Sequence, residues 1–295
     1  MRARALAPGK VNLCLLLGGT RPDGRHELVT LFESLSLADE LTLQTQASGA
    51  DEVICAGVEG PNLVAAAIAG LRQRGWDGPS VRIEVHKRIP VAAGLGGGSA
   101  DAACALRLAA AVAPLPDAAV IAELAASLGA DVPSQLEPGL VVGTGAGERV
   151  EPVAPTAPHS LVIVPLPAAL STPAVYAEAD RLGLSRPAEA LRDRLGRLRA
   201  ALVAGARPPA DLLCNDLEAA ARSLCPEIGP ALAAVAALGA DHVLVCGSGP
   251  TVAGLFWADA VNRASEAAAA LAGRYPGVVA ATPVEAAFGA VAALA

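Results

Sequence analysis

A glycine-rich stretch between a predicted strand and a predicted helix carries the clearest chemical signal in the chain. Alternating apolar residues predict a strand over 81–86, and an alanine-rich run predicts a helix over 100–113. Gly94-Leu95-Gly96-Gly97-Gly98-Ser99 lies between them. Glycines let a backbone approach an oxyanion closely, and a helix N-terminus offers unpaired N–H groups and a positive dipole end. The stretch therefore predicts a phosphate-binding loop.

Two common phosphate-binding motifs do not describe this loop. A Walker loop needs Gly-Lys-Ser/Thr, which occurs nowhere in the sequence. A dinucleotide loop needs a third glycine where Ser99 stands, and an acidic residue that ends the next strand. Asp117 lies at a suitable distance, but it follows two prolines and is typical of a helix cap. A plain packing turn is the remaining alternative, and four glycines within five residues before a serine disfavour it.

Length and composition set the broad class. With 295 residues the chain is long enough for a large core and two domains. Hydrophobic residues make up 53% and charged residues 17%, which indicates a folded globular protein. The net charge of −7, with no basic run to offset it, argues against a nucleic-acid partner. We expect a small-molecule substrate instead.

Cysteine spacing and hydropathy bear on the compartment. The six cysteines are widely spaced without a C-x-x-C pair, which predicts buried free thiols in a reducing compartment. The apolar run near the N-terminus is interrupted by Pro8, Gly9, Lys10 and Asn12, unlike a signal peptide. No stretch reaches the length of a membrane span, despite a mean hydropathy of +0.47. We expect a cytoplasmic protein with no membrane partner.

A polar pair stands on an otherwise apolar strand near the start of the chain. Lys10 and Asn12 alternate with Val11 and Leu13 within the strand predicted over 5–17, so they share one face. Such a pair is either an exposed edge or part of a site, and the strand alone leaves both open. A turn-rich segment follows over 18–26, and one or two further strands are predicted over 28–43.

The glycine loop and four other segments resemble the GHMP kinase superfamily, named for galacto-, homoserine, mevalonate and phosphomevalonate kinases. Within it, the triple glycine is similar to kinases that act on 4-diphosphocytidyl-2-C-methyl-D-erythritol in non-mevalonate isoprenoid biosynthesis. The matching segments are Pro90–Ala100 (P-x-x-x-G-L-G-G-G-S-A), Pro8–Leu13 (P-x-K-x-N-L), Arg21–His26 (R-x-D-G-x-H), Leu28–Phe32 (L-x-T-L-F) and Gly129–Pro133 (G-A-D-V-P).

The resemblance implies an α+β fold with two domains. The N-terminal domain would be like ribosomal protein S5 domain 2, the C-terminal domain would be ferredoxin-like, and the active site would lie in the cleft between them. Residues 151–158 contain three prolines and no periodicity, which is typical of a boundary. We therefore expect an ATP-binding domain over 1–153 and a second domain over 154–295.

The resemblance also implies an activity, namely ATP-dependent phosphorylation of the 2-hydroxyl of the cytidine-diphosphate erythritol. The cofactors would be ATP and Mg²⁺, with Ser99 at the helix start near the metal, whose ligands stay unassigned. The resemblance assigns ATP binding to Pro90, Val91, Ala92, Ala93, Gly94, Leu95, Gly96, Gly97, Gly98, Ser99 and Ala100, with Asn62 and Lys87 beside the adenine. For Lys87, a solvated strand end is an equally open interpretation.

Two residues are implied to be catalytic. Asp131, in the G-A-D-V-P segment, would accept the proton of the substrate hydroxyl or only orient that hydroxyl. Lys10 would keep the aspartate ionised and offset developing negative charge. By composition alone, an aspartate between glycine and proline is usually a turn former.

Four residues are implied to bind the phosphate acceptor. Asn12 would orient the erythritol hydroxyls, His26 would bind the cytosine edge, and Tyr176 would form one wall of the cytosine slot. The sequence departs from the family at Arg25, where an aromatic residue usually precedes the histidine. A guanidinium plane also stacks on a base, and it adds positive charge for the diphosphate. For Tyr176, a buried core residue is the alternative.

Two other functions stay open at this point. One is a GHMP kinase that acts on another alcohol, such as mevalonate or homoserine, for which the segment before His26 would have no role. The other is a nucleotide-binding module without catalysis, which would need neither Lys10 nor Asp131. We expect a monomer or a weak homodimer.

Overall fold

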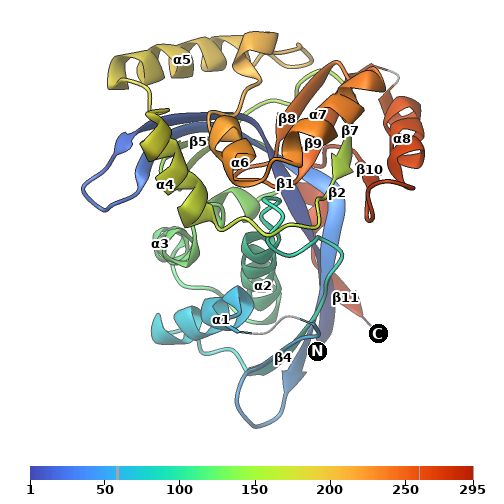
Figure 1. Cartoon of the computed structure of the whole chain (residues 1–295). Helices are drawn as coiled ribbons and strands as arrows, with labels where there is room; N and C mark the ends of the chain where they lie inside the picture. The colour runs from blue at the N-terminus through green and yellow to red at the C-terminus, as the bar shows by residue number, and fades with distance from the viewer. Residues whose placement is uncertain (58–59, 259, 295) are drawn as a thin grey trace.

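Two β-sheets with helices around them make up the molecule (Figure 1). The computed structural model describes residues 1–57, 60–258 and 260–294, with backbone only at 260 and 261. The larger sheet has seven strands in the order β11-β1-β2-β4-β3, with β5 between β2 and β6. Its strands are β1 (Arg2–Thr20), β2 (His26–Gln46), β3 (Glu52–Cys55), β4 (Ser80–His86), β5 (Leu140–Gly145), β6 (Arg149–Pro152) and β11 (Ala292–Leu294).

The long antiparallel pair of β1 and β2 forms the centre of this sheet. Strand β2 pairs with β5 over 28–33 and with β4 over 40–46, so one continuous strand serves two sets of neighbours. The register of β1 on β2 shifts at Gly9, at Leu13 and between Leu17 and Thr20. At the first shift the N–H of Lys10 donates to the carbonyl of Leu95, 2.9 Å away, in the phosphate loop. The irregularity thus brings β1 against the loop, and such irregularities often lie next to active sites.

Three helices cover one face of the larger sheet (Figure 1). They are α1 (Leu63–Gln73), α2 (Gly97–Val112) and α3 (Ala118–Leu128), and α2 confirms the helix predicted over 100–113. Small residues allow close packing, since a Cβ on Gly70 of α1 would lie 2.4 Å from Leu124 of α3. Asp117 occupies the first position before α3, but within the described residues its side chain makes no capping hydrogen bond.

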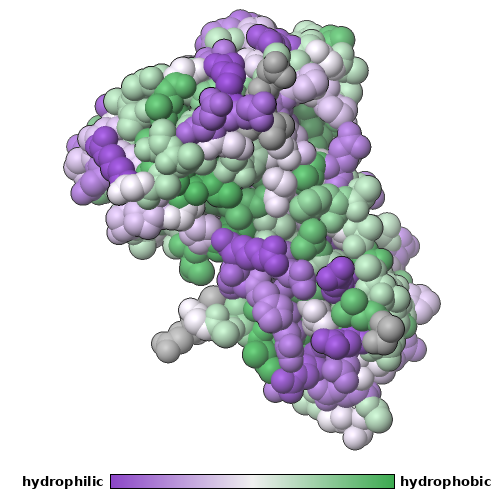
Figure 2. Space-filling model, turned by 90° about the vertical axis from the view of Figure 1, so that its right-hand side faces the viewer, coloured by the Kyte–Doolittle hydropathy of each residue, from purple (hydrophilic) through white to green (hydrophobic). Residues whose placement is uncertain are grey.

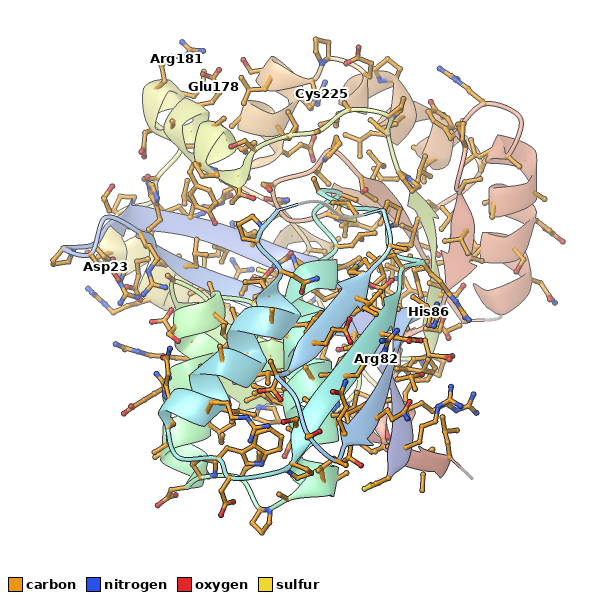
Figure 3. All side chains as sticks on the ribbon, turned by 90° about the horizontal axis from the view of Figure 1, so that it is seen from below. Asp23, Arg82, His86, Glu178, Arg181 and Cys225 are labelled. Atoms are coloured by element: carbon orange, nitrogen blue, oxygen red, sulfur yellow. The ribbon has the colours of Figure 1, made fainter. Side chains whose placement is uncertain are left out.

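Strand β4 shows how the apolar pattern selects the buried face. Val81, Ile83 and Val85 are buried against the helices, as the alternation predicts. Arg82 and His86 project from the opposite side of the strand (Figure 3). The strand therefore carries apolar packing on one face and polar contacts on the other.

The smaller sheet has four strands in the order β10-β7-β9-β8. Strands β8 and β9 pair antiparallel, and the segment that joins them contains Gly247–Pro250. The strands are β7 (His159–Val164), β8 (His242–Val245), β9 (Val252–Trp257) and β10 (Val279–Ala281). The helices of this half are α4 (Thr172–Leu182), α5 (Ala188–Ala201), α6 (Glu218–Leu224), α7 (Ile228–Ala237) and α8 (Ala260–Leu271). The chain also has short 3-10 helices, namely η1 (Pro133–Gln135) between α3 and β5, η2 (Ala210–Leu212) and η3 (Ala286–Gly289).

The two halves share one core. An apolar cluster joins residues of β1, β2 and β5 to residues of β7, β8 and β9, and Leu191 and Leu198 of α5 pack into it. His159 on β7 and Glu33 on β2 form a buried ion pair of 2.8 Å across the same contact. Strand β11 returns to pair with β1, so the end of the chain belongs to the first sheet. The division at 153/154 stays a prediction.

The surface mixes apolar and polar residues, as the high mean hydropathy requires. Figure 2 shows hydrophobic residues between hydrophilic areas on one face. Within the part of the chain that the structure describes, every helix is too short or too polar to cross a lipid bilayer. Cys14, Cys104, Cys225 and Cys246 are buried free thiols, whereas Cys55 and Cys214 are half-buried free thiols.

Candidate active site

A cavity of about 540 Å³ collects most of the predicted site residues. Arg25, His26 and Ala100 do not line it. The predicted residues that line the cavity are Lys10, Asn12, Asn62, Lys87, Pro90, Val91, Ala92, Ala93, Gly94, Leu95, Gly96, Gly97, Gly98, Ser99, Asp131 and Tyr176. Leu63, which the resemblance places beside the adenine together with Asn62, also lines the cavity. The other lining residues are Leu15, Leu28, Thr30, Phe32, Cys55, Pro61, Asp101, Ala130, Ala146, Thr172, Leu217, Gly247 and Ser248.

The phosphate loop has the backbone geometry that its glycines suggest. Gly94 and Gly96 have φ angles of 78° and 67°, in the left-handed region that favours glycine. Gly96 precedes α2 directly, and the helix begins at Gly97. The N–H groups of a first helical turn have no intrahelical acceptor, so this end of α2 presents donors and a positive dipole end to the cavity. Anionic phosphates fit such an end.

A second glycine loop packs on the first. A Cβ on Gly94 would lie 2.1 Å from the carbonyl oxygen of Cys246 and 3.0 Å from that of Gly249, so only glycine fits there. Asn215 holds this second loop, since its side-chain amide donates to the carbonyls of Val245 and Gly247 at 2.8 and 2.7 Å. The Asn215–Glu218 segment therefore supports the phosphate loop indirectly.

Lys10 lies at the centre of the cavity and joins the loop to the aspartate. Its Nζ is 3.3 Å from Oδ2 of Asp131, and it donates to Oδ1 of Asn12 at 2.8 Å and to the carbonyl of Gly94 at 3.1 Å. Its side chain is 4% exposed, whereas that of Asp131 is 32% exposed. The ammonium is therefore buried, and the carboxylate that it contacts is accessible from the cavity.

Hydrogen bonds fix the neighbours of this ion pair. The amide nitrogen of Asn12 donates to Thr30 Oγ1 at 2.7 Å, and Thr30 donates to the carbonyl of Cys14 at 2.7 Å. This chain turns the amide oxygen of Asn12 toward Lys10. On the other side, Ser134 Oγ donates to the carbonyl of Asp131 at 2.7 Å and holds the turn before η1. No role was predicted for Thr30, although it is the threonine of the matching L-x-T-L-F segment, which was the available signal.

Two further polar residues of the cavity have different partners: Asn62 caps a helix, and Lys87 forms ion pairs. Asn62 precedes α1, and its side-chain oxygen accepts the N–H of Val64 at 2.8 Å, which makes it a helix cap as well as a lining residue. Lys87 forms ion pairs with Asp39 and Asp101. The alternative of a solvated strand end for Lys87 is therefore wrong. Neither aspartate was predicted; a lone carboxylate among the alanines of α2 was the available signal for Asp101.

Burial and the neighbouring charges shift the pKa values of Asp101 and Lys87. Burial, opposed by Lys87 and reinforced by Asp39, raises the pKa of Asp101 to about 7. Burial disfavours the ammonium of Lys87, but Asp101 and Asp39 outweigh it, so the pKa of Lys87 lies above its usual value. The lysine thus stays charged at neutral pH.

The opposite end of the cavity is formed by α4 and the loop between β8 and β9. Tyr176 faces the cavity, and burial raises the pKa of its hydroxyl, which therefore stays protonated. Thr172 and Ser248 line the same end, and their hydroxyl oxygens lie 3.0 Å apart. Glu178 and Arg181 of the same helix pair at 2.6 Å and lie away from the centre of the molecule (Figure 3).

His26 and Arg25 lie differently although they are adjacent. His26 is buried behind Tyr176, with ring centroids 5.1 Å apart, and its Nε2 is 2.7 Å from Oδ1 of Asp180. Arg25 is 48% exposed and pairs with Asp23 at 3.1 Å in the turn between β1 and β2. Figure 3 shows Asp23 near the tip of that hairpin, at the edge of the molecule. The structure brings His26 to the edge of the site and leaves Arg25 outside it.

The donor set bears on Mg²⁺. Among the described residues no group of three or more His, Cys, Asp or Glu side chains is arranged around a common metal position. Magnesium with a nucleotide usually takes one or two protein oxygens, with phosphates and waters as its other ligands. The Asp131 carboxylate and the Ser99 hydroxyl in the cavity fit that requirement.

Comparisons with known proteins agree with this geometry. The family described as GHMP kinases N terminal domain matches residues 62–139, and that described as GHMP kinases C terminal matches residues 188–276. The 4-diphosphocytidyl-2-C-methyl-D-erythritol kinase of Nocardia farcinica is 42% identical over 279 residues, covering 90% of this chain and 88% of the relative. That of Thermobifida fusca is 42% identical over 280 residues, with 90% and 89% covered.

Solved structures show the same fold. A crystal structure of 4-(cytidine 5'-diphospho)-2C-methyl-D-erythritol kinase has a TM-score of 0.76 and 35% identity, covering 95% of this chain and 98% of the other. The homoserine kinase of Cytophaga hutchinsonii has a TM-score of 0.70 at 16% identity, covering 99% and 97%, and shows the fold alone. The predicted α+β GHMP kinase fold is confirmed. The chain belongs to the 4-diphosphocytidyl-2-C-methyl-D-erythritol kinase family of the GHMP kinases.

Proposed function

We propose that this chain transfers the γ-phosphoryl group of ATP to the 2-hydroxyl of 4-diphosphocytidyl-2-C-methyl-D-erythritol, a step of non-mevalonate isoprenoid biosynthesis. One observation carries the proposal. Lys10 Nζ contacts both the Asp131 carboxylate and the Gly94 carbonyl, at 3.3 and 3.1 Å. A phosphate-binding loop and a carboxylate that can receive a hydroxyl proton are therefore joined through one cation.

The loop and the start of α2 bind the phosphates of ATP. Backbone N–H groups near Gly96 supply donors, and the helix dipole adds positive potential without a mobile side chain. The adenine lies toward Asn62 and Lys87, which both line the cavity. Ser99 would hold Mg²⁺ beside the phosphates, where the ion would supply positive charge that offsets the charge of the transferred group.

Asp131 and Lys10 act on the acceptor hydroxyl. Asp131 accepts the proton or orients the oxygen, because the loose transition state of phosphoryl transfer asks little of a base. Lys10 pairs with the Asp131 carboxylate and stabilises negative charge that develops beside Gly94. Asn12, whose amide is fixed by Thr30 and Lys10, orients the erythritol hydroxyls.

The cytidine end lies toward α4. Tyr176 forms one wall of the base slot, and His26 behind it binds the base edge while Asp180 holds the imidazole. Arg25 in the exposed turn is the predicted substrate residue with the least structural support. The domain division, the cytoplasmic location and the monomer or weak homodimer stay predictions.

The test is ATP consumption by the purified protein with the cytidine-diphosphate erythritol, with mevalonate and homoserine as controls. We expect turnover with the cytidine compound alone. Turnover with a control instead would keep the GHMP kinase chemistry and overturn the substrate. ATP binding without turnover of any of the three would overturn the proposal in favour of a nucleotide-binding module.

A further inference from the structure

A buried cluster of one lysine and two aspartates lies at the base of the phosphate loop. We call Asp39, Lys87 and Asp101 the Lys87 cluster. Asp39 belongs to β2, Lys87 directly follows β4, and Asp101 lies in α2. Lys87 Nζ donates to Oδ2 of Asp39, and it lies 2.7 Å from Oδ2 of Asp101. The phosphate loop leaves β4 at Lys87 and enters the helix that carries Asp101, so this ion pair joins its two ends.

Asp39 also holds the backbone at the start of the loop. Its Oδ1 accepts the N–H of Arg88 at 2.5 Å and that of Ile89 at 2.8 Å. Its other oxygen contacts Lys87. One carboxylate therefore fixes three consecutive residues, 87–89, immediately before the loop turns into the cavity.

The burial of the cluster makes these contacts matter. Asp39 is 0% exposed and Asp101 is 5% exposed. Breaking a buried ion pair leaves an uncompensated charge, which costs far more than breaking a surface pair. Oδ1 of Asp101 has no hydrogen-bond partner among the described residues, so the contact of this carboxylate with the ammonium runs through Oδ2. Asp101 is thus placed to act on the loop through Lys87.

The loop itself has few other constraints of this kind. Val91 is 65% exposed, and Ala92 adopts a φ of 55°, which is unusual for a residue other than glycine. Lys10 holds the middle of the loop, through its contacts with the carbonyls of Gly94 and Leu95. The Lys87 cluster holds the base. An anion site made of backbone N–H groups depends on both, because its donors are set by the path of the loop.

We propose that Asp39 and Asp101 are positioning residues for ATP, which act through Lys87 by fixing the two ends of the phosphate loop. The inference rests on the proposed function for the identity of the nucleotide. Lys87 then has two structural partners, Asp39 and Asp101, in addition to its place in the nucleotide site. Loss of the cluster loosens the loop and weakens ATP binding, while the Lys10–Asp131 pair that serves the acceptor hydroxyl stays in place.

A double-mutant cycle tests this coupling. Asp101→Asn, Lys87→Met and the double variant are compared with the wild type, with the exposed Asp117→Asn as the matched control. Titration calorimetry gives the Kd for ATP, and steady-state kinetics give kcat and both KM values. We expect each single change to raise the Kd for ATP by about tenfold and the double change to raise it no further than Lys87→Met alone. The KM for the erythritol substrate and kcat should change by less than about twofold.

Three outcomes would overturn the inference. The first is a double variant in which the effects of the two single changes multiply. The second is an unchanged Kd for ATP in the single variants. The third is an equal rise in both KM values, which general loosening of the fold would produce. ATP binding with the expected coupling but without turnover of the erythritol substrate would support the inference and contradict only the proposed function. Absence of ATP binding in the wild type would overturn both.

A measurement on the unaltered protein guards against variants that fail to fold. Hydrogen exchange of the wild type without nucleotide should show strong protection of the Arg88 and Ile89 amides, which Asp39 accepts. Val91, the exposed residue of the same loop, supplies the internal reference. Exchange at 88 and 89 as fast as at 91 would overturn the role given to Asp39.

Discussion

The two ends of the cavity are built in different ways. The nucleotide end comes largely from one continuous segment, 87–101, in which a strand end, a glycine loop and a helix start follow one another. The acceptor end is assembled from β1, β2, α4 and the loop between β8 and β9, which are far apart in the sequence. A local segment carries its geometry in its own residue types, whereas the assembled end depends on how the two sheets pack.

The catalytic pair lies where the two ends meet, so its loss should have the largest effect. We expect Asp131→Asn to lower kcat by about 10²–10⁴-fold, because the amide accepts no proton and no longer pairs with Lys10. ATP affinity measured without Mg²⁺ should be retained, because Asp131 reaches the phosphate loop only through Lys10. Rapid-quench kinetics and ATP titration separate the two, with the exposed Asp193→Asn as control. Near-normal turnover would remove Asp131 from the chemistry.

The nucleotide end should be intolerant of a methyl group at one glycine and tolerant at another. Gly94→Ala places a Cβ 2.1 Å from the Cys246 carbonyl, at a φ of 78°. We expect it to lower the free energy of unfolding by about 2–3 kcal/mol and to weaken ATP binding by at least about tenfold. Gly98→Ala is the matched control for stability alone, because its nearest neighbour, a methyl of Leu63, is 3.6 Å away, whereas its place in the cavity leaves ATP binding open to change. Equal behaviour of the two variants would contradict the packing of the two glycine loops.

This contrast explains what the sequence could predict. The loop, the start of α2 and the aspartate of the G-A-D-V-P segment depend on short-range residue order, and the structure brings them together in one cavity. Strands over 5–17 and 28–43 were predictable from alternation, but their full extents, Arg2–Thr20 and His26–Gln46, were not. Strand β2 remains continuous because β5 and β4 pair with different parts of it, which is a tertiary effect.

The features that escaped prediction share a cause. Asp39 and Asp101 meet Lys87 only after β2, β4 and α2 pack together, so no spacing along the chain indicates them. Strand β11 has three residues and pairs with the first strand of the chain, a contact that local propensity does not encode. Partners that arise from packing require the structure.

The acceptor end should respond selectively to loss of the histidine. We expect His26→Ala to raise the KM for the cytidine substrate by about tenfold and to leave the KM for ATP unchanged, because His26 packs on Tyr176 and not on the phosphate loop. The exposed His86→Ala on β4 is the control. A comparable rise in the KM for ATP would indicate that the two ends are not independent.

The buried pair between the sheets gives a pH-dependent test of how the two ends are held together. Burial disfavours the imidazolium of His159, but Glu33 outweighs it, so the pKa of His159 lies above its ordinary value. The stabilisation is then fully present below the unfolded pKa of about 6.5 and is lost as the pH rises through the higher folded pKa. We expect His159→Gln to remove about 1 kcal/mol of stability at pH 5.5 and less at pH 9, by urea unfolding. A penalty that grows with pH would contradict this sign.

Loss of Arg25 should have the smallest effect on substrate binding, and it tests whether the hairpin turn takes part in the acceptor end. Its guanidinium is 48% exposed and bound to Asp23 in the hairpin turn, outside the cavity that Tyr176 lines. Exposed ion pairs contribute little, so we expect Arg25→Ala to change the KM for the cytidine substrate by at most about twofold. Arg25→Tyr restores the aromatic residue usual in the family and serves as the companion variant. A large loss in Arg25→Ala that the tyrosine restores would mean that the turn closes over the base when substrate binds, so that the acceptor end, unlike the nucleotide end, is completed by its ligand.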